Sequence, residues 1–106
     1  MSQYYSLLFI WSKGAKVRQE VLCIIHNAGL ANKPIYISEI TNVFNSSRQM
    51  ENHITNSSIR KHIKVLKEYK IVRPINEGGR PEFLELTEEG KTIIEKIKSS
   101  QKKIKI

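Results

Sequence analysis

The fold is decided by residues 57–97, which read SSIRKHIKVLKEYKIVRPINEGGRPEFLELTEEGKTIIEKI. The first part of this stretch repeats apolar residues at the spacing of one helical face, which predicts a helix over residues 57–70. Thr55 or Asn56 can cap this helix, and Ile54 can pack against Ile59 in its first turn. The predicted buried stripe is Ile59, Ile63 and Leu66. The opposite face carries Ser57, Arg60, Lys61, Lys64 and Glu68.

The second part of the stretch predicts a β-hairpin and a last helix. Residues 71–75 form a strand-like run whose proline belongs at a sheet edge, and residues 82–86 alternate as a half-exposed strand. Paired glycines supply the positive φ angles that a tight turn requires over residues 77–80. Thr87 can cap the last helix, with two glutamates in its first turn. The apolar stripe of this helix is Ile93, Ile97 and Ile104.

Upstream, the sequence predicts two further helices and a short strand. Residues 12–28 fit a helix that Ser12 caps and Gly29 ends, with a stripe of Val17, Val21, Ile24 and Ala28. A turn at residues 32–34 and a strand at residues 35–37 follow. Ser38 can cap a second helix, whose predicted buried stripe is Ile40, Val43 and Phe44. Residues 45–52 are polar, and they fit either a loop or a frayed extension of that helix.

The predicted order of elements is helix, strand, helix, helix, strand, hairpin, strand, helix. Over residues 15–98 this order resembles the winged helix-turn-helix domains of the MarR-, ArsR- and PadR-like regulators. The similarity is most specific within residues 57–97. These hold a recognition helix, an L-x-x-x-x-I-V entry into the wing from Leu66, a glycine-rich wing tip and an L-T-x-x-G start of the last helix from Leu86. Residues 45–55 depart from the pattern, because the usual turn before the recognition helix is shorter.

The resemblance implies an α+β fold with a three-helix core, a small antiparallel sheet, a β-hairpin wing and a C-terminal helix. A length of 106 residues suits a single domain. We therefore predict a winged-helix core over residues 13–98. An apolar N-terminal extension over residues 1–12 and a basic C-terminal tail over residues 99–106 flank it.

The composition argues against catalysis and against a membrane location. All ten acidic residues are glutamates, which excludes Asp-based triads and DxD metal clusters. The chain also lacks a nucleophile elbow and a P-loop, so we predict that it is not an enzyme. A single cysteine suits a reducing cytosol, and the apolar run at residues 4–11 is too short to span a bilayer. The expected location is cytoplasmic: nucleoid-associated in a prokaryote, or the host cytoplasm for a virus.

A metal site is not predicted. The residues that can ligate a metal are Cys23, His26, His53 and His62. Cys23 and His26 can share a helix face, but a structural zinc site takes about four ligands. The other two histidines lie in different segments. We therefore expect no metal and no cofactor, and we expect Cys23 to be a half-buried helix residue.

Positive charge is concentrated in two segments. The chain carries 18 Lys and Arg residues against 10 acidic ones, for a net charge of +8. Residues 57–70 hold five basic residues against one glutamate, and residues 91–106 hold six lysines against one glutamate. Between them, residues 71–90 hold five glutamates and two arginines. Five basic residues within one predicted helix favour a nucleic-acid partner over an ordinary solvated surface.

These features together predict sequence-specific binding to double-stranded DNA, most simply by a transcriptional regulator. The 57–70 helix would enter the major groove, where the planar fork of Arg60 matches the edge of a guanine. The wing at residues 77–81 would lay Arg80 along the adjacent backbone or minor groove. The predicted DNA-binding set is Ser57, Ser58, Arg60, Lys61, Lys64, Arg73 and Arg80.

Two other functions fit the same predicted fold. One is a winged-helix module that docks on protein, and the other is a non-specific architectural DNA-binding protein. Duplex binding that weakens steeply with salt distinguishes DNA binding from docking, and sequence discrimination distinguishes a regulator from an architectural protein. We also predict a homodimer, because residues 4–11 are too apolar to be left in water on a small domain. Together with Ile97 and Ile104 they would form the dimer seam; the alternative is that they cap the core of a single chain.

Overall fold

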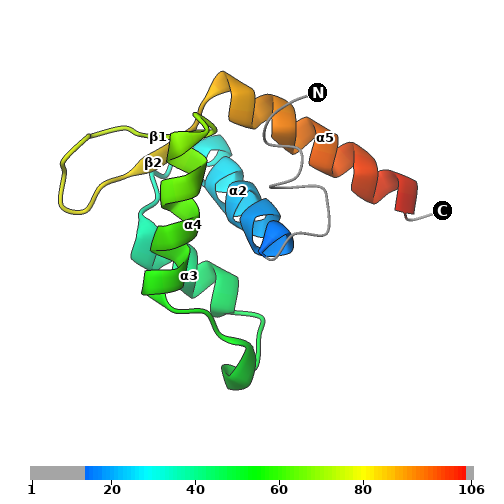
Figure 1. Cartoon of the computed structure of the whole chain (residues 1–106), viewed down its shortest axis with the longest axis horizontal. Coiled ribbons are helices and arrows are strands. Elements are labelled where there is room, and N and C mark those ends of the chain that lie inside the picture. Colours follow the sequence, from blue (N-terminus) through cyan, green and yellow to red (C-terminus); the bar gives the residue numbers. More distant parts are fainter. Residues whose placement is uncertain (1–13, 105–106) are drawn as a thin grey trace.

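The computed structural model describes residues 14–104, with side chains up to residue 99. Within that range, four α-helices and one two-stranded antiparallel sheet give an α+β fold (Figure 1). The helices are α2 (Ala15–Leu30), α3 (Ile37–Asn45), α4 (Asn56–Glu68) and α5 (Glu88–Ile104), and the short 3₁₀ helix η1 (Met50–Asn52) lies between α3 and α4. The strands are β1 (Val72–Pro74) and β2 (Leu84–Leu86). The predicted apolar extension at residues 1–12 lies outside the described residues.

Helix α4 has the cap and the two faces that its sequence predicts. Thr55 is the N-cap residue, and its side-chain oxygen accepts a hydrogen bond from the Ser58 amide at 3.1 Å. The predicted stripe is buried to 1% exposure or less: Ile59, Ile63 and Leu66. The predicted outer face is exposed, namely Ser57, Arg60, Lys61, Lys64 and Glu68. The spacing of apolar residues therefore identified the direction in which the basic side chains point.

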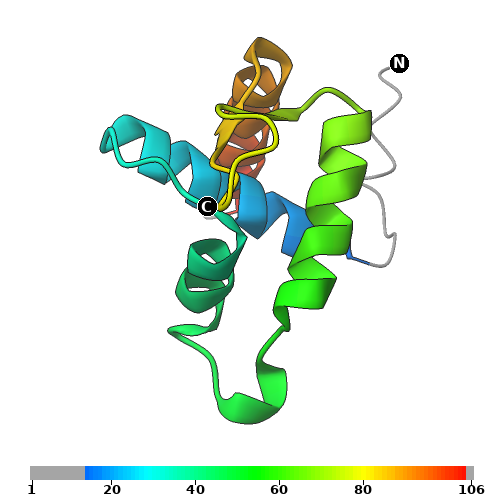
Figure 2. The same ribbon diagram turned by 90° about the vertical axis from the view of Figure 1, so that its left-hand side faces the viewer.

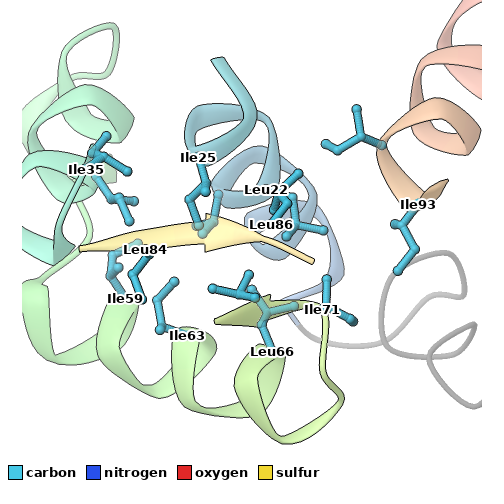
Figure 3. Close-up of a cluster of buried hydrophobic side chains, with 14 of the residues drawn as sticks. Leu22, Ile25, Ile35, Ile59, Ile63, Leu66, Ile71, Leu84, Leu86 and Ile93 are labelled. Carbon is cyan, nitrogen blue, oxygen red and sulfur yellow. The ribbon is translucent and has the colours of Figure 1, made fainter. Parts of the chain in front are cut away.

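Strand β2 crosses the core between α2 and α4 (Figure 3). The two strands pair in the register Val72 with Leu86, Arg73 with Glu85, and Pro74 with Leu84. The predicted strand at residues 35–37 is reduced to one bridge, in which the Leu84 amide donates to the Ile35 carbonyl at 2.9 Å. That strand is short because Ile37 already begins α3. The core around β2 is formed by side chains of α2, α4 and the strands, including Leu22, Ile25, Ile59, Ile63, Leu66, Ile71, Leu84 and Leu86.

Helix α2 buries a face that overlaps only partly with the predicted one, because Val21 is buried as predicted and the rest of the predicted stripe is not. Its fully buried residues include Val21, Leu22 and Ile25, whereas Val17, Ile24 and Ala28 are only partly buried. The reason is that α2 packs against α3, α5 and β2, so residues on either side of the main stripe also make contacts. The helix begins after Gly14, which has a φ of 88°, and Gly29 lies inside it rather than ending it. The predicted cap, Ser12, lies outside the described residues.

Helix α3 begins two residues earlier than predicted, and Ser38 does not cap it. Tyr36 occupies the N-cap position without a side-chain hydrogen bond. Ile40 and Phe44 are buried as predicted, but Val43 is 50% exposed and Thr41 takes its place in the buried face. The hydroxyl of Thr41 can be buried because it donates a hydrogen bond to the Ile37 carbonyl, at 2.9 Å.

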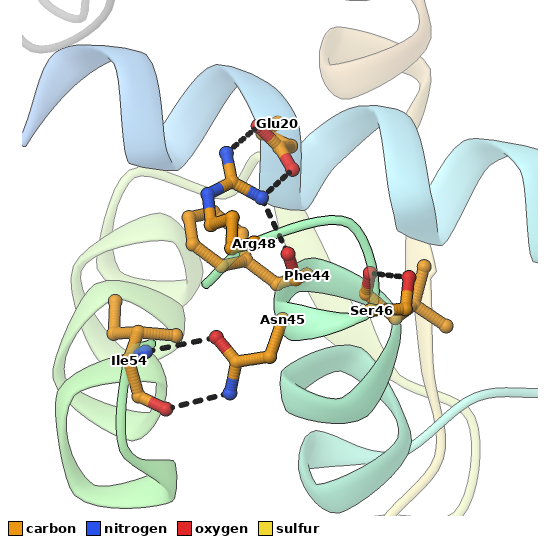
Figure 4. Close-up of polar contacts among 7 residues, drawn as sticks. Glu20, Phe44, Asn45, Ser46, Arg48 and Ile54 are labelled. Atoms are coloured by element: carbon orange, nitrogen blue, oxygen red, sulfur yellow. Dashed lines mark hydrogen bonds and ion pairs between the residues drawn. The ribbon is translucent and has the colours of Figure 1, made fainter. Parts of the chain in front are cut away.

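The long connection between α3 and α4 is closed at its base by one side chain (Figure 4). The Asn45 side-chain amide donates to the Ile54 carbonyl at 2.9 Å and accepts from the Ile54 amide at 2.8 Å. Arg48 then ties the connection to α2 through two hydrogen bonds to Glu20, at 2.6 and 2.8 Å. Its guanidinium also lies 3.8 Å from the centre of the Phe44 ring. Residues 46–53 therefore form a loop that is closed at its base and projects beyond the ends of α3 and α4 (Figure 2). They are not a frayed extension of α3.

Helix α5 is capped as predicted and lies on the side of the molecule opposite the hairpin (Figure 1). The Thr87 hydroxyl accepts a hydrogen bond from the Gly90 amide at 3.1 Å and contacts the Ile71 carbonyl at the same distance. Gly90 has to be small, because a Cβ atom there would lie 2.4 Å from that carbonyl oxygen. The helix continues to Ile104, so most of the predicted basic tail is helical. Among residues 14–104, no helix has the length and apolar character needed to cross a membrane.

Candidate nucleic-acid interface

A hollow of about 460 Å³ lies between α4, the start of α3 and the hairpin loop. Figure 2 views the molecule from the hairpin side, toward this region. The start of α3 contributes Tyr36, Ile37 and Ser38, and the hairpin contributes Pro81 and Glu82. Helix α4 lines the hollow with Arg60, Ile63, Lys64 and Lys67. Three of these four α4 residues are basic, so the wall that α4 supplies is positively charged.

The polar residues on the outer side of α4 lie in two neighbouring rows. Arg60, Lys64 and Lys67 are spaced four and three residues apart, which places them along one line of a helix facing the hollow. Ser57 and Lys61 begin the next row, further from the hollow, and both are exposed. Within residues 14–104, no carboxylate pairs with Arg60, Lys61 or Lys64. These three cations are therefore available to an anionic partner.

Lys67 differs from these three because it is paired with Glu82 across the hollow. The Lys67 ammonium donates to one carboxylate oxygen of Glu82, and the Gly78 amide donates to the other at 3.3 Å. The hydrogen bond from Lys67 and the one from Gly78 hold the pKa of Glu82 below its ordinary value. Sequence reasoning missed both residues. The spacing from Arg60 and Lys64 could have identified Lys67, whereas nothing in the sequence indicates that Glu82 lies beside it.

The opposite flank of α4 is held against α2. Arg18 of α2 donates to the Nδ1 atom of His62 at 3.2 Å. Burial and the charge of Arg18 together hold the pKa of His62 below its ordinary value. The contact is close: a Cβ atom on Gly14 would lie 2.8 Å from the His62 ring. Both flanks of α4 are thus fixed by neighbouring elements, and the row between them faces outward.

The other predicted site residues differ in how close they lie to the basic residues of α4. Arg80 is exposed in the hairpin loop and directly precedes Pro81, which lines the hollow. Ser58 is half-buried, and Thr55 accepts its amide hydrogen bond. Arg73 bonds to Glu85 on the facing strand, with 2.7 Å between nitrogen and oxygen. It lines a second hollow, formed with the end of α2 and the start of α5, so it is not brought together with the basic residues of α4.

The residues considered as metal ligands are scattered. Cys23 is half-buried, as predicted, and burial raises the pKa of its thiol. His53 donates a hydrogen bond from its Nε2 to the Arg48 carbonyl oxygen, at 2.9 Å. His62 contacts Arg18. Over residues 14–104, no group of three or more Cys, His or Glu residues is arranged to hold a metal ion.

Comparison with known proteins shows that the chain resembles a solved structure in its fold. No protein family matches the sequence, and no curated protein matches it. The fold is similar to the crystal structure of AF1382 from Archaeoglobus fulgidus, with a TM-score of 0.68 and 25% sequence identity. The likeness covers 98% of this chain and 99% of that one. It therefore extends over the whole arrangement rather than one motif, and it bears on fold rather than on ligand or partner.

Proposed function

We propose that this protein binds double-stranded DNA as a winged helix-turn-helix domain. In this proposal α4 enters the major groove, and the hairpin loop contacts the adjacent backbone or minor groove. The observation that carries it is the outer face of α4. Arg60, Lys61 and Lys64 are exposed there, and they lack an acidic partner among residues 14–104. DNA presents a dense line of phosphates that such cations neutralise.

The arrangement of elements supports the same proposal. A helix is the element that fits the width of the major groove, and residues near its N-terminus reach the base edges. Arg60 lies in the first half of α4, where base contact is expected, and its fork can bond guanine in two places. Lys61, Lys64 and Ser57 suit phosphate contacts. Arg80 suits the wing contact, whereas the pairing of Arg73 with Glu85 on another side leaves Arg73 out of the set.

A sequence-specific regulator is the simplest role for such a domain. We propose a transcriptional regulator that acts in the cytoplasm, associated with the nucleoid in a prokaryotic cell. A selection of preferred sites from random duplexes, at a stated salt concentration, tests this role. A defined consensus supports a regulator. Equal recovery of all sequences would instead indicate an architectural DNA-binding protein.

Single substitutions on α4 should separate base contact from phosphate contact. Arg60→Ala should cost about 1–3 kcal/mol on the preferred duplex and relax discrimination at one base pair. Lys64→Ala should weaken binding to all duplexes alike. It should also reduce the slope of log K against log salt concentration by about one. Titrations of preferred and scrambled duplexes at several salt concentrations measure both effects. Lys96→Ala is the matched control, since it removes one exposed cation from α5, and it should change neither quantity appreciably.

We further propose that two copies of the chain bind a palindromic site. A two-fold dimer would place its two recognition helices about 34 Å apart, one turn of DNA. Ile97 cannot contribute to the predicted seam, because it is 2% exposed within a single chain. The other predicted seam residues lie outside the described side chains. Sedimentation at tens of micromolar should yield twice the 12.3 kDa mass of one chain, and a monomer at that concentration would contradict the proposal.

A further inference from the structure

We propose that Glu82 is a positioning residue for the DNA contact: its carboxylate fastens the hairpin loop to α4 and so sets the distance between the wing and the α4 cations. This inference rests on the proposed function. Judged by its charge alone, Glu82 would be expected to weaken DNA binding. A carboxylate on a DNA-binding surface repels phosphate, so its presence beside Arg60 and Lys64 requires a physical reason.

The contacts of Glu82 join two separate parts of the chain. One carboxylate oxygen accepts from Lys67 on α4, and the other accepts from the Gly78 amide at the hairpin tip, at 3.3 Å. Lys67 and Glu82 are both partly shielded, with side-chain exposures of 35% and 27%. Glu82 therefore links the tip of the hairpin to the C-terminal half of α4.

Among the residues whose side chains are described, the other side-chain hydrogen bonds of the loop do not reach α4. The Asn76 side chain donates to the Pro81 carbonyl at 3.1 Å and accepts from the Phe83 amide at 2.7 Å. These two bonds shape the loop internally. At its base, the Phe83 ring meets the Tyr36 ring edge-on, with 5.6 Å between their centres, which anchors the loop near the start of α3. Among the described residues, the pair of Lys67 and Glu82 is the contact that links the loop to α4 by an ion pair.

Charge considerations support positioning over simple repulsion. Pairing with Glu82 occupies Lys67, which would otherwise extend the basic row that Arg60 and Lys64 begin. A surface shaped only for phosphate affinity would leave Lys67 free, because each neutralised phosphate adds to binding. What the pair contributes instead is order in the loop before DNA arrives, which reduces the entropy lost on binding. This benefit applies to the duplex that fits both α4 and the wing.

The test compares Glu82→Ala with Glu77→Ala, which removes a carboxylate from an exposed position in the same loop. Glu82→Ala should lower affinity for the preferred duplex by about tenfold, the scale of an ordering cost, and leave or raise affinity for a scrambled duplex. Glu77→Ala should leave or slightly raise affinity for both. The double reversal Lys67→Glu/Glu82→Lys keeps the net charge and restores an ion pair, so it should recover most of the preferred-site affinity that Lys67→Glu alone loses.

Amide hydrogen exchange of the free chain provides a readout that needs no DNA. Glu82→Ala should speed exchange in residues 75–83 and leave the buried amides of α4 unchanged, whereas Glu77→Ala should do neither. If Glu82→Ala and Glu77→Ala affect duplex binding alike and neither changes exchange, the carboxylate only repels and the inference is wrong. If the parent chain binds no duplex, the proposed function fails first. The exchange rates would then still decide whether Glu82 holds the hairpin.

Discussion

An Arg60→Ala/Lys61→Ala/Lys64→Ala variant should bind duplex DNA roughly a hundredfold or more weakly than the parent chain at about 0.1 M salt. Each lysine that neutralises a phosphate accounts for about tenfold at that salt, because its counterion is no longer released. Arg60 adds the loss of a base contact on the preferred site. All three side chains are exposed on α4, so their removal should leave the fold intact. Fluorescence anisotropy titrations on labelled duplexes measure the loss.

The control for this variant removes the same charge elsewhere. A Lys91→Ala/Lys96→Ala/Lys98→Ala variant loses three exposed cations from α5, which lies opposite the hairpin (Figure 1). It should bind much more tightly than the α4 variant, since only long-range attraction is reduced. Equal losses in the two variants would mean that net charge alone drives binding, as in an architectural protein. Parental binding by the α4 variant would reject groove insertion and favour docking on a protein.

Ile63→Ala should destabilise the fold by about 2–5 kcal/mol, the range for a large buried aliphatic residue cut back to alanine. Ile63 is 1% exposed and lies in the core between α4 and β2 (Figure 3). The substitution leaves a cavity at the point where α4 meets the sheet, so the cost includes lost packing as well as lost burial. Urea unfolding followed by circular dichroism gives the change in the free energy of unfolding.

The adjacent residue offers the matched control. Lys64→Ala removes an exposed side chain one position along the same helix and should change stability by no more than about 0.5 kcal/mol. The two substitutions thus have opposite signatures: Ile63→Ala weakens folding, and Lys64→Ala weakens DNA binding. A small effect of Ile63→Ala on stability would show that this face of α4 does not hold the helix to the core. The proposal that Arg60, Lys61 and Lys64 face outward would then be wrong as well.

Helix α4 matters to the proposed function because three sets of contacts fix its rotation. Its apolar stripe packs into the core, His62 meets Arg18 on one flank, and Lys67 meets Glu82 on the other. A helix held on three sides presents its fourth side in a single orientation. Side chains held in place in this way lose less freedom on binding than side chains on a mobile helix.

Patterns among residues close together in the sequence were sufficient to predict the orientation of α4 and the caps of two helices. The stripe of Ile59, Ile63 and Leu66 gave the orientation of α4, because the period of the helix converts spacing directly into direction. Thr55 and Thr87 were identifiable as caps because a capping hydroxyl reaches an amide only a few residues away. The hairpin turn was predicted in part: Gly78 has the positive φ of 79° that a tight turn requires, but Gly79 does not share it. The strands are also shorter than predicted, since β1 ends at Pro74 and β2 begins at Leu84. Each of these features depends on residues close together in the sequence.

Tertiary structure decided the features whose partners are distant in the sequence. The buried face of α2 was predicted only in part: Val21 is buried, but the face continues through Leu22 and Ile25. Because α3, α5 and β2 all pack around this helix, the spacing of its apolar residues could not show which of two neighbouring faces is buried more deeply. The closure of residues 46–53 depends on Arg48 meeting Glu20 of α2. In the same way, the pairing of Arg73 with Glu85 and its place in a different hollow from the α4 cations follow from the fold and not from the sequence. Lys67 and Glu82 meet only because the hairpin folds back toward α4. The helical period fixes the direction in which each side chain of one helix points. An ion pair between distant segments depends instead on where two side chains lie in space, and only the folded chain sets that distance.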